Sequence, residues 1–289
     1  MTDLPEQTPN AVRIFREPAL VRRSEAARFL WGDEESHHVS DLIYGRGERI
    51  SALIYHLRPG EQFRGSSVWK PIYDQHRVYY VVSGTLAISD PESGEIATAV
   101  AGEAISWRGA RYHFGFNFGT EETFVLDWYA PPERGIDVPE VAVSAAKRDL
   151  GEVRPGRLEL LGAWPDRLAE TRAASQAGGV VTVRPADALH LIHGESAPYL
   201  VEILASSDAL TFGTFSLRPS LMTEPEAHPG DEVVFALEGG LHVYLPDSHD
   251  WFELGPLDCA FIPGGTPHRY CNHGAATNRA AFCVAPLFR

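Results

Sequence analysis

The sequence predicts an all-β protein built from two consecutive copies of one antiparallel barrel or sandwich. Short runs of β-branched and aromatic residues alternate with polar residues, as half-buried strands require. Turn signals such as SG, DPESG, EGG, LPDSHD and PGGTP interrupt these runs every ~8–12 residues, which is typical of sandwiches and barrels. An internal repeat indicates that the unit occurs twice.

The repeat is visible in two pairs of segments. RVYYVVSGTLAI (77–88) aligns with EVVFALEGGLHV (232–243), and ALIYHLRPG (52–60) resembles FGTFSLRPS (212–220). Glu232 lies 155 residues after Arg77, and the same offset aligns His113 with His268 and Asn117 with Asn272.

The repeat sets the domain boundaries. We predict a first barrel with an N-terminal arm over residues 1–137 and a second barrel over 179–289. Residues 138–178 are Ala-rich and charged and end in GG, so we expect a short, partly helical linker there.

Composition narrows the range of functions. The 289 residues carry a formal net charge of -14, which repels phosphate backbones and anionic lipids, so neither nucleic acid nor a membrane is an expected partner. No apolar run approaches the ~20 residues of a membrane helix, and the polar N-terminus lacks a secretion signal, so we expect a cytoplasmic protein. Cys259, Cys271 and Cys283 lie in strand-like runs and are expected to be buried thiols.

The segment EAHPGDEVVFALEGG (226–240) sets two carboxylates and an imidazole at the start of an apolar run. Glu226 and His228 would share one face of an extended strand, and a Pro-Gly turn would lead to Glu232 on the returning strand. The turn PGGTP delivers His268 to a further strand. Two carboxylates and two imidazoles at one barrel opening would stay underpaired without a cation, which indicates a divalent metal site.

These residues resemble the two motifs of the cupin superfamily, whose fold is a jelly-roll β-barrel. The positions that match are Glu226, His228, Glu232 and Gly239 in the first motif, and Pro263, Gly265, His268 and Asn272 in the second. The resemblance covers roughly 45–131 and 200–286, so the chain looks like a bicupin with two jelly-roll barrels in tandem. Glu226 replaces the usual first His of the motif, and Leu257 replaces a Gly.

The resemblance implies that Glu226, His228, Glu232 and His268 bind one divalent metal ion. A carboxylate-rich set favours Mn(II) or Fe(II), with Zn(II) as an alternative. Four protein ligands on a six-coordinate ion leave two positions for a substrate, or for a substrate and dioxygen. Glu226 and Glu232 are the candidate catalytic residues, because one of them could act as a general base. The alternative is a hydrogen-bonded structural cluster without metal, and no organic cofactor is expected.

The first copy lacks these ligands. The offset of 155 aligns Tyr73 with His228 and Arg77 with Glu232, and arginine cannot ligate a cation. Tyr73, Arg77 and His113 are candidates for a second pocket that takes an aromatic or carboxylate ligand. The simpler interpretation is that Arg77 pairs with an acid, Glu103 or Asp74, and that aromatic residues fill the barrel. The histidines without a partner at ligand spacing, expected to be ordinary, are His190, His193, His242, His249 and His273.

Three classes of function remain open. The first is a metal-dependent enzyme acting on a small organic substrate, with dioxygenase-type oxidation favoured because such enzymes form a large group of bicupins. The second is a non-redox Mn(II) hydrolase or isomerase, since the Glu-x-His pattern partly resembles ureidoglycine aminohydrolase. The third is a non-catalytic small-molecule-binding cupin, whose metal site a fifth ligand, Asp231 or Glu224, would close. Cupins commonly assemble through strand edges, so we expect a homodimer.

Overall fold

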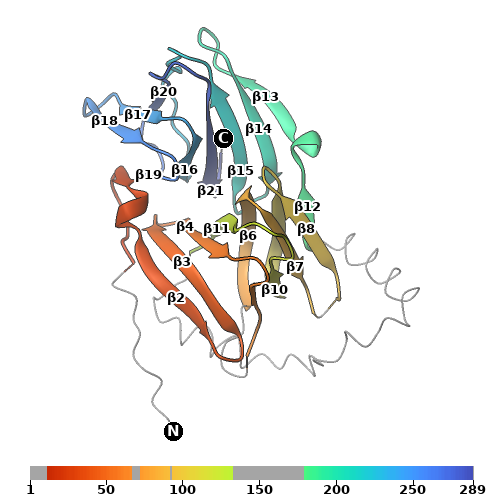
Figure 1. The fold of residues 1–289 in the computed structure, drawn as a ribbon. Helices are drawn as coiled ribbons and strands as arrows, with labels where there is room; N and C mark the ends of the chain where they lie inside the picture. The colour runs from red at the N-terminus through yellow and green to blue at the C-terminus, as the bar shows by residue number, and fades with distance from the viewer. Residues whose placement is uncertain (1–11, 67–71, 92, 133–178, 289) are drawn as a thin grey trace.

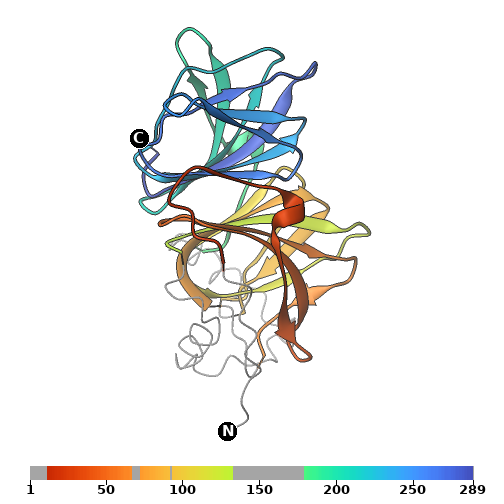
Figure 2. The ribbon, with the colours of Figure 1, turned by 90° about the vertical axis from the view of Figure 1, so that its left-hand side faces the viewer.

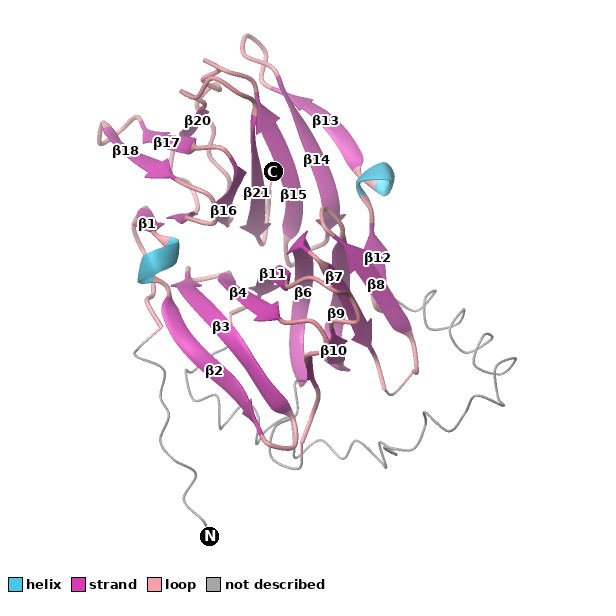
Figure 3. Ribbon diagram, in the orientation of Figure 1, coloured by secondary structure: helices cyan, strands magenta, loops and turns pink. Residues whose placement is uncertain are grey.

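A computed structural model describes residues 12–66, 72–91, 93–132 and 179–288 (Figure 1). These residues form β-strands and two short 3-10 helices, η1 (Arg23–Glu25) and η3 (Pro185–Asp187), and no α-helix occurs among them (Figure 3). The all-β prediction is confirmed. The predicted linker, 138–178, lies outside the described residues.

The first barrel consists of β2 (Ala27–Asp33), β3 (His37–Arg46), β4 (Ser51–Leu57), β5 (Gln62–Phe63), β6 (Ile72–Ser83), β7 (Thr85–Ser89), β8 (Ile96–Val100), β9 (Ala104–Tyr112), β10 (Phe114–Phe116), β11 (Thr123–Ala130) and β12 (Val181–Val183). A seven-stranded sheet in the order β12-β9-β6-β11-β4-β3-β2 faces a four-stranded sheet in the order β5-β10-β7-β8. A core that includes Tyr55, Tyr79 and Trp107 fills the space inside.

The second barrel consists of β1 (Ala19–Val21), β13 (Leu189–His193), β14 (Tyr199–Ser206), β15 (Thr211–Leu217), β16 (Asp231–Glu238), β17 (Leu241–Leu245), β18 (Asp250–Leu254), β19 (Cys259–Ile262), β20 (Arg269–Cys271) and β21 (Asn278–Ala285). Its seven-stranded sheet runs β1-β19-β16-β21-β15-β14-β13, and a three-stranded sheet runs β18-β17-β20. The two barrels are stacked one on the other (Figure 2).

Two aligned asparagines make equivalent hydrogen bonds in the two barrels. The side-chain amide of Asn117 donates a hydrogen bond to the carbonyl of Leu57 (3.0 Å), and that of Asn272 donates to the carbonyl of Leu217 (2.7 Å). In each barrel this bond joins the loop after a short strand to the end of a core strand. The internal repeat predicted from the sequence is therefore present in the fold.

Each half of the chain gives one edge strand to the other half. β1, from the N-terminal part, pairs antiparallel with β19, so that Val21 lies opposite Cys259. β12, which follows the predicted linker, pairs with β9 of the first barrel, so that Val181 lies opposite Ser106. The exchange covers sheet edges that would otherwise expose unpaired backbone groups.

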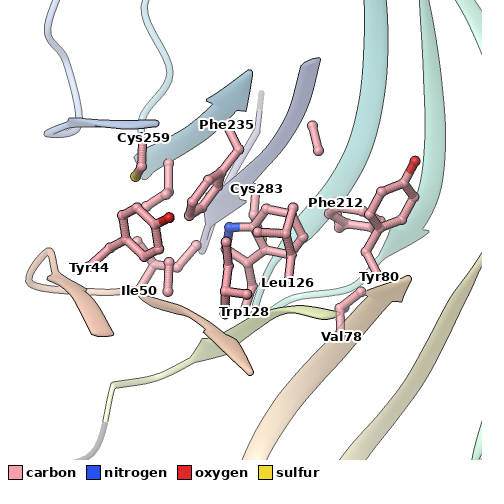
Figure 4. Packing of buried hydrophobic residues seen from close by; sticks show 14 of the residues in the cluster. Tyr44, Ile50, Val78, Tyr80, Leu126, Trp128, Phe212, Phe235, Cys259 and Cys283 are labelled. Atoms are coloured by element: carbon pink, nitrogen blue, oxygen red, sulfur yellow. The ribbon is translucent and has the colours of Figure 1, made fainter. Parts of the chain in front are cut away.

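The two seven-stranded sheets pack against each other through a shared hydrophobic core (Figure 4). Trp128 from the first barrel contacts Phe212 and Phe235 from the second, with ring centroids 4.8 and 5.6 Å apart. The hydroxyl of Tyr44 donates to the carbonyl of Leu257 across the same boundary (2.6 Å). Large aromatic side chains that are fully buried dominate packing energies, so this core joins the barrels into one unit.

The three cysteines are buried and form no disulfide, as predicted. Burial raises the pKa of the Cys259 and Cys283 thiols well above the usual range. Both thiols therefore stay protonated and serve as packing groups in the core between the barrels.

His76 makes a buried polar contact between the barrels. Its Nδ1 lies 2.7 Å from the Ser207 hydroxyl of the second barrel and its Nε2 lies 2.8 Å from the Ser106 hydroxyl of the first. Burial, aided by the positive charge of Arg108, lowers the pKa of His76 from 6.5 to about 4. The folded protein thus holds this imidazole neutral where the unfolded chain would already bind a proton.

We predict that this histidine makes the fold sensitive to acid. Because the folded pKa is below the unfolded one, stability is lost as the pH falls from 6.5 toward 4, by about 3 kcal/mol at most. Urea unfolding at pH 7 and pH 4.5 should show a smaller acid-induced loss in His76→Gln than in the wild type. The exposed His38→Gln serves as control, and equal losses in His76→Gln and wild type would contradict the assignment.

Candidate metal centre

A backbone bridge brings two of the predicted ligands together. The Glu226 N–H donates to the His268 carbonyl and the His268 N–H donates to the Glu226 carbonyl, both at 2.9 Å. This bridge lies outside the named strands, so Glu226 belongs to an isolated pairing and not to the regular strand that the sequence predicts. The Gly265 N–H donates to the His228 carbonyl (2.7 Å) and fixes the second turn against the first.

The turn between His228 and Glu232 depends on close backbone approach. A Cβ on Gly230 would lie 2.5 Å from the carbonyl oxygen of Ala285, so any larger residue would clash with β21. The chain then enters β16 at Asp231, which places Glu232 inside the barrel opposite Ile262 of β19.

The structure places the side chains of all four predicted ligands close together. Nε2 of His268 lies 3.0 Å from Oε2 of Glu232, and Nε2 of His228 lies 3.5 Å from the same oxygen. Nε2 of His228 is also 3.9 Å from Oε2 of Glu226. One donor atom each from Glu226, His228 and His268 lie within 4.8 Å of one another, an arrangement that could hold a metal ion.

Main-chain carbonyls fix both imidazoles in the same tautomer. Nδ1 of His228 lies 2.9 Å from the carbonyl of Phe288, and Nδ1 of His268 lies 3.0 Å from the carbonyl of Thr266. A carbonyl only accepts, so each Nδ1 carries a proton and each Nε2 is the ring atom that faces the carboxylates. The Phe288 ring also stacks on His228, with centroids 4.7 Å apart.

The buried donor atoms of this cluster suit a cation. Glu232 is 2% exposed and His268 is 1% exposed. Oε2 of Glu232 and Nε2 of His268 are both buried and lie 3.0 Å apart, and neither makes a well-aligned hydrogen bond among the described residues. In that part of the chain, the ion-pair partners of Glu226 and Glu232 are histidines, with no lysine or arginine. A buried carboxylate beside a second, partly buried one is costly without a balancing charge, and a divalent ion would balance both.

Glu232 and His268 each shift the pKa of the other. Burial alone would raise the pKa of Glu232, but the imidazoles of His228 and His268 lower it further than burial raises it. Burial alone would lower the pKa of His268, but the Glu232 carboxylate more than reverses this, and the net direction is upward. Without a metal the proton therefore resides on the imidazole, and a metal ion would have to displace it.

Asp231 and Glu224, the two carboxylates considered as a fifth ligand, accept hydrogen bonds from main-chain N–H groups instead. Asp231 accepts hydrogen bonds from the Gly264 and Arg49 N–H groups, each at 3.0 Å. Glu224 accepts from the Glu195 N–H (3.0 Å) and from Ser196. The described structure thus does not direct either of them into the cluster.

Two residues beside Glu226 were not predicted from the sequence. Nε2 of His193 lies 2.9 Å from Oε2 of Glu226, and the Tyr199 hydroxyl donates to Oε1 (3.1 Å). The sequence offers His193 no partner at ligand spacing, and the pairing of β13 with β14 brings it to the cluster. No signal within the first motif could have shown this.

In the first barrel the position of Glu232 is taken by a buried ion pair. Arg77 Nη2 lies 2.7 Å from Oδ2 of Asp127, and Arg77 Nε lies 2.9 Å from Oδ1. The predicted partner Glu103 instead pairs with Arg184 (3.3 Å), so that prediction is wrong. The other one, Asp74, lies among residues whose side chains the structure does not describe.

The candidate second pocket of the first barrel is described only in part. Arg77 carries a charge that Asp127 balances, and Nε2 of His113 lies 3.0 Å from the Tyr79 hydroxyl. The side chain of Tyr73 lies outside the description. Because Arg77 is neutralised, a carboxylate ligand would have to compete with Asp127 for it.

Comparison with known proteins agrees with this architecture. Residues 213–284 match the family model described as Cupin domain, and no curated protein sequence matches the chain. AerE from Microcystis aeruginosa is 10% identical, with a TM-score of 0.57 over 90% of this chain and 97% of AerE. A variant of oxalate decarboxylase from Bacillus subtilis is 14% identical, with a TM-score of 0.60 over 97% of this chain and 80% of its own. Ylba from E. coli is 10% identical, with a TM-score of 0.61 over 96% of this chain and 94% of Ylba.

The fold and the matched segment define a two-barrel, jelly-roll protein. The second barrel carries the match to the Cupin domain family, over residues 213–284. The comparisons support the superfamily but not the finer similarity to ureidoglycine aminohydrolase. No helix among the described residues has the length and hydropathy needed to span a membrane.

We predict that Asp127 is required for the stability of the first barrel. Replacing it by Ala removes the carboxylate that lies 2.7 Å from the buried Arg77 guanidinium, which should cost about 3–5 kcal/mol of unfolding free energy. The matched control is Glu48→Ala, whose pair with Arg16 is exposed and should change stability by less than about 1 kcal/mol. Chemical denaturation measures both, and similar effects of the two substitutions would contradict the prediction.

Proposed function

We propose that this protein is a metal-dependent enzyme that acts on a small organic substrate at one divalent ion in the second barrel. The observation that carries the proposal is the convergence of Glu232 and His268, whose facing ligand atoms are buried, 3.0 Å apart and without a well-aligned hydrogen bond. Glu226 and His228 complete the proposed ligand set.

The proposed ion is Mn(II) or Fe(II), with Zn(II) as the alternative. Two carboxylates and two imidazoles form a harder ligand set than three imidazoles, and hard sets suit Mn(II) and Fe(II). Two ionised carboxylates would also balance the charge of a divalent ion. Oxalate decarboxylase from Bacillus subtilis, a structural relative at 14% identity, is described as having Mn(II) centers, which is consistent with this choice.

An enzyme is favoured over a storage protein because the proposed site is not closed by a further carboxylate. Asp231 and Glu224 are occupied by main-chain N–H groups. Four protein ligands on a six-coordinate ion would then leave two positions for a small chelating molecule. A small-molecule-binding cupin without turnover remains the third proposal, and it would show ligand binding without product.

The first proposed reaction is oxidation of the substrate by dioxygen. When bound, Fe(II) or Mn(II) would supply Lewis acidity and one-electron chemistry toward dioxygen. Among the two candidate catalytic carboxylates, the Glu226 side chain is 10% exposed and the Glu232 side chain 2%. We therefore assign the acceptance of a substrate proton to Glu226, the more exposed of the two.

The second proposed reaction is a non-redox hydrolysis or isomerisation with Mn(II). The same general base would serve it, so side-chain geometry supports both reactions equally. Metal content together with oxygen uptake over a panel of small molecules with two adjacent oxygen donors separates them. Iron with oxygen consumption supports oxidation, and manganese with turnover but no consumption supports the non-redox reaction.

We predict that His268→Ala loses the metal ion. The purified wild type should contain about one divalent ion per chain, and the variant should bind Mn(II) at least ~10-fold more weakly, since even residues behind a ligand contribute that much. Elemental analysis and a chelator competition measure this. His273→Ala removes an exposed histidine and should match the wild type. Unchanged occupancy in His268→Ala would place the metal elsewhere.

A further inference from the structure

The carboxylate of Glu226 is held by side chains from two neighbouring strands. Tyr199 on β14 donates a hydrogen bond to Oε1 (3.1 Å), and Nε2 of His193 on β13 lies 2.9 Å from Oε2. The two residues are direct cross-strand partners in the antiparallel pairing of β13 with β14. Each oxygen of Glu226 thus has its own contact to the same strand pair.

Ring packing holds Tyr199 and His193 in place on these two strands. Tyr199 is buried, and its ring packs edge-on against Phe215 of the barrel core with centroids 5.7 Å apart. The His193 ring packs edge-on against Tyr199, at 5.3 Å. The two side chains therefore reach Glu226 from a position that the core of the second barrel fixes.

Glu226 itself lacks such support from its own segment. Its backbone is attached through the isolated bridge to His268, outside any named strand. A glutamate side chain has several rotatable bonds, and fixing it costs up to about 2 kcal/mol of conformational entropy. Contacts that fix the carboxylate before a metal ion arrives remove that cost from binding.

We propose that His193 and Tyr199 are positioning residues that hold Glu226 as a ligand and direct its Oε2 toward His228. This inference rests on the proposed function, because it assigns the residues to the same metal ion. It assigns a role to a histidine and a tyrosine that lie 33 and 27 residues before Glu226 in the sequence. Neither residue is a proposed ligand.

The test is the affinity of the full-length protein for Mn(II), measured by competition with a chelator. His193→Gln and Tyr199→Phe should each weaken binding by ~10-fold, the usual effect of removing a group that orients a ligand. His190→Gln changes an exposed histidine of the same strand, and Tyr244→Phe removes an exposed hydroxyl bonded to His249. Both controls should stay within ~2-fold of the wild type.

A double-mutant cycle shows whether the effect passes through Glu226. In a Glu226→Ala background, His193→Gln and Tyr199→Phe should no longer change the Mn(II) affinity. An equal loss in that background would overturn the inference, because the residues would then act on the barrel in general. Wild-type affinity in both single variants would overturn it while leaving the proposed function intact, whereas absence of Mn(II) binding by the wild type would overturn both.

Discussion

The contact between Glu232 and two imidazoles inside the second barrel constrains what this molecule can do. A carboxylate that is 2% exposed must be compensated, and in the described structure histidines are its ionic partners. The carbonyls of Phe288 and Thr266 accept from the two Nδ1 atoms, so both Nε2 atoms stay directed at the carboxylates. The surrounding backbone, with its bridge and its close turn at Gly230, serves to keep these donors together.

The two barrels solve the same electrostatic problem in opposite ways. In the first barrel, Arg77 and Asp127 neutralise each other within the protein. In the second, the residue aligned with Asp127 is Phe282, so that acid is absent. The residue aligned with Arg77 is Glu232, so an acid occupies the position of the arginine. The same barrel fold thus accommodates a buried Arg-Asp ion pair in one copy and a cluster of carboxylates and imidazoles suited to a metal ion in the other.

Much of the fold follows from local patterns. Period-two alternation and turn spacing predict the strands, and the offset between Arg77 and Glu232 predicts the repeat, because both signals are properties of short segments. The four proposed ligands were also found from spacing, since two turns place them at one barrel opening. The cupin resemblance rests on those same residues.

The contacts that the sequence did not predict form between segments that are distant in the chain. Asp127 was missed as the partner of Arg77, although its alignment with Phe282 was a signal that two positions had changed together. His193 and Tyr199 were missed because the pairing of β13 with β14, and the packing of Tyr199 on Phe215, bring them to Glu226. The Phe288 carbonyl was missed because a backbone group carries no sequence signature.

The reciprocal placement of β1 and β12 has a consequence for how such a chain can be divided. A gene fragment encoding residues 179–289 would produce a polypeptide whose β19 edge is bare and whose β12 segment has no sheet to join. Bare edges recruit strands from other molecules, so isolated halves would tend to associate with one another or aggregate. Each barrel therefore depends on the other for the strand that completes one edge of its larger sheet.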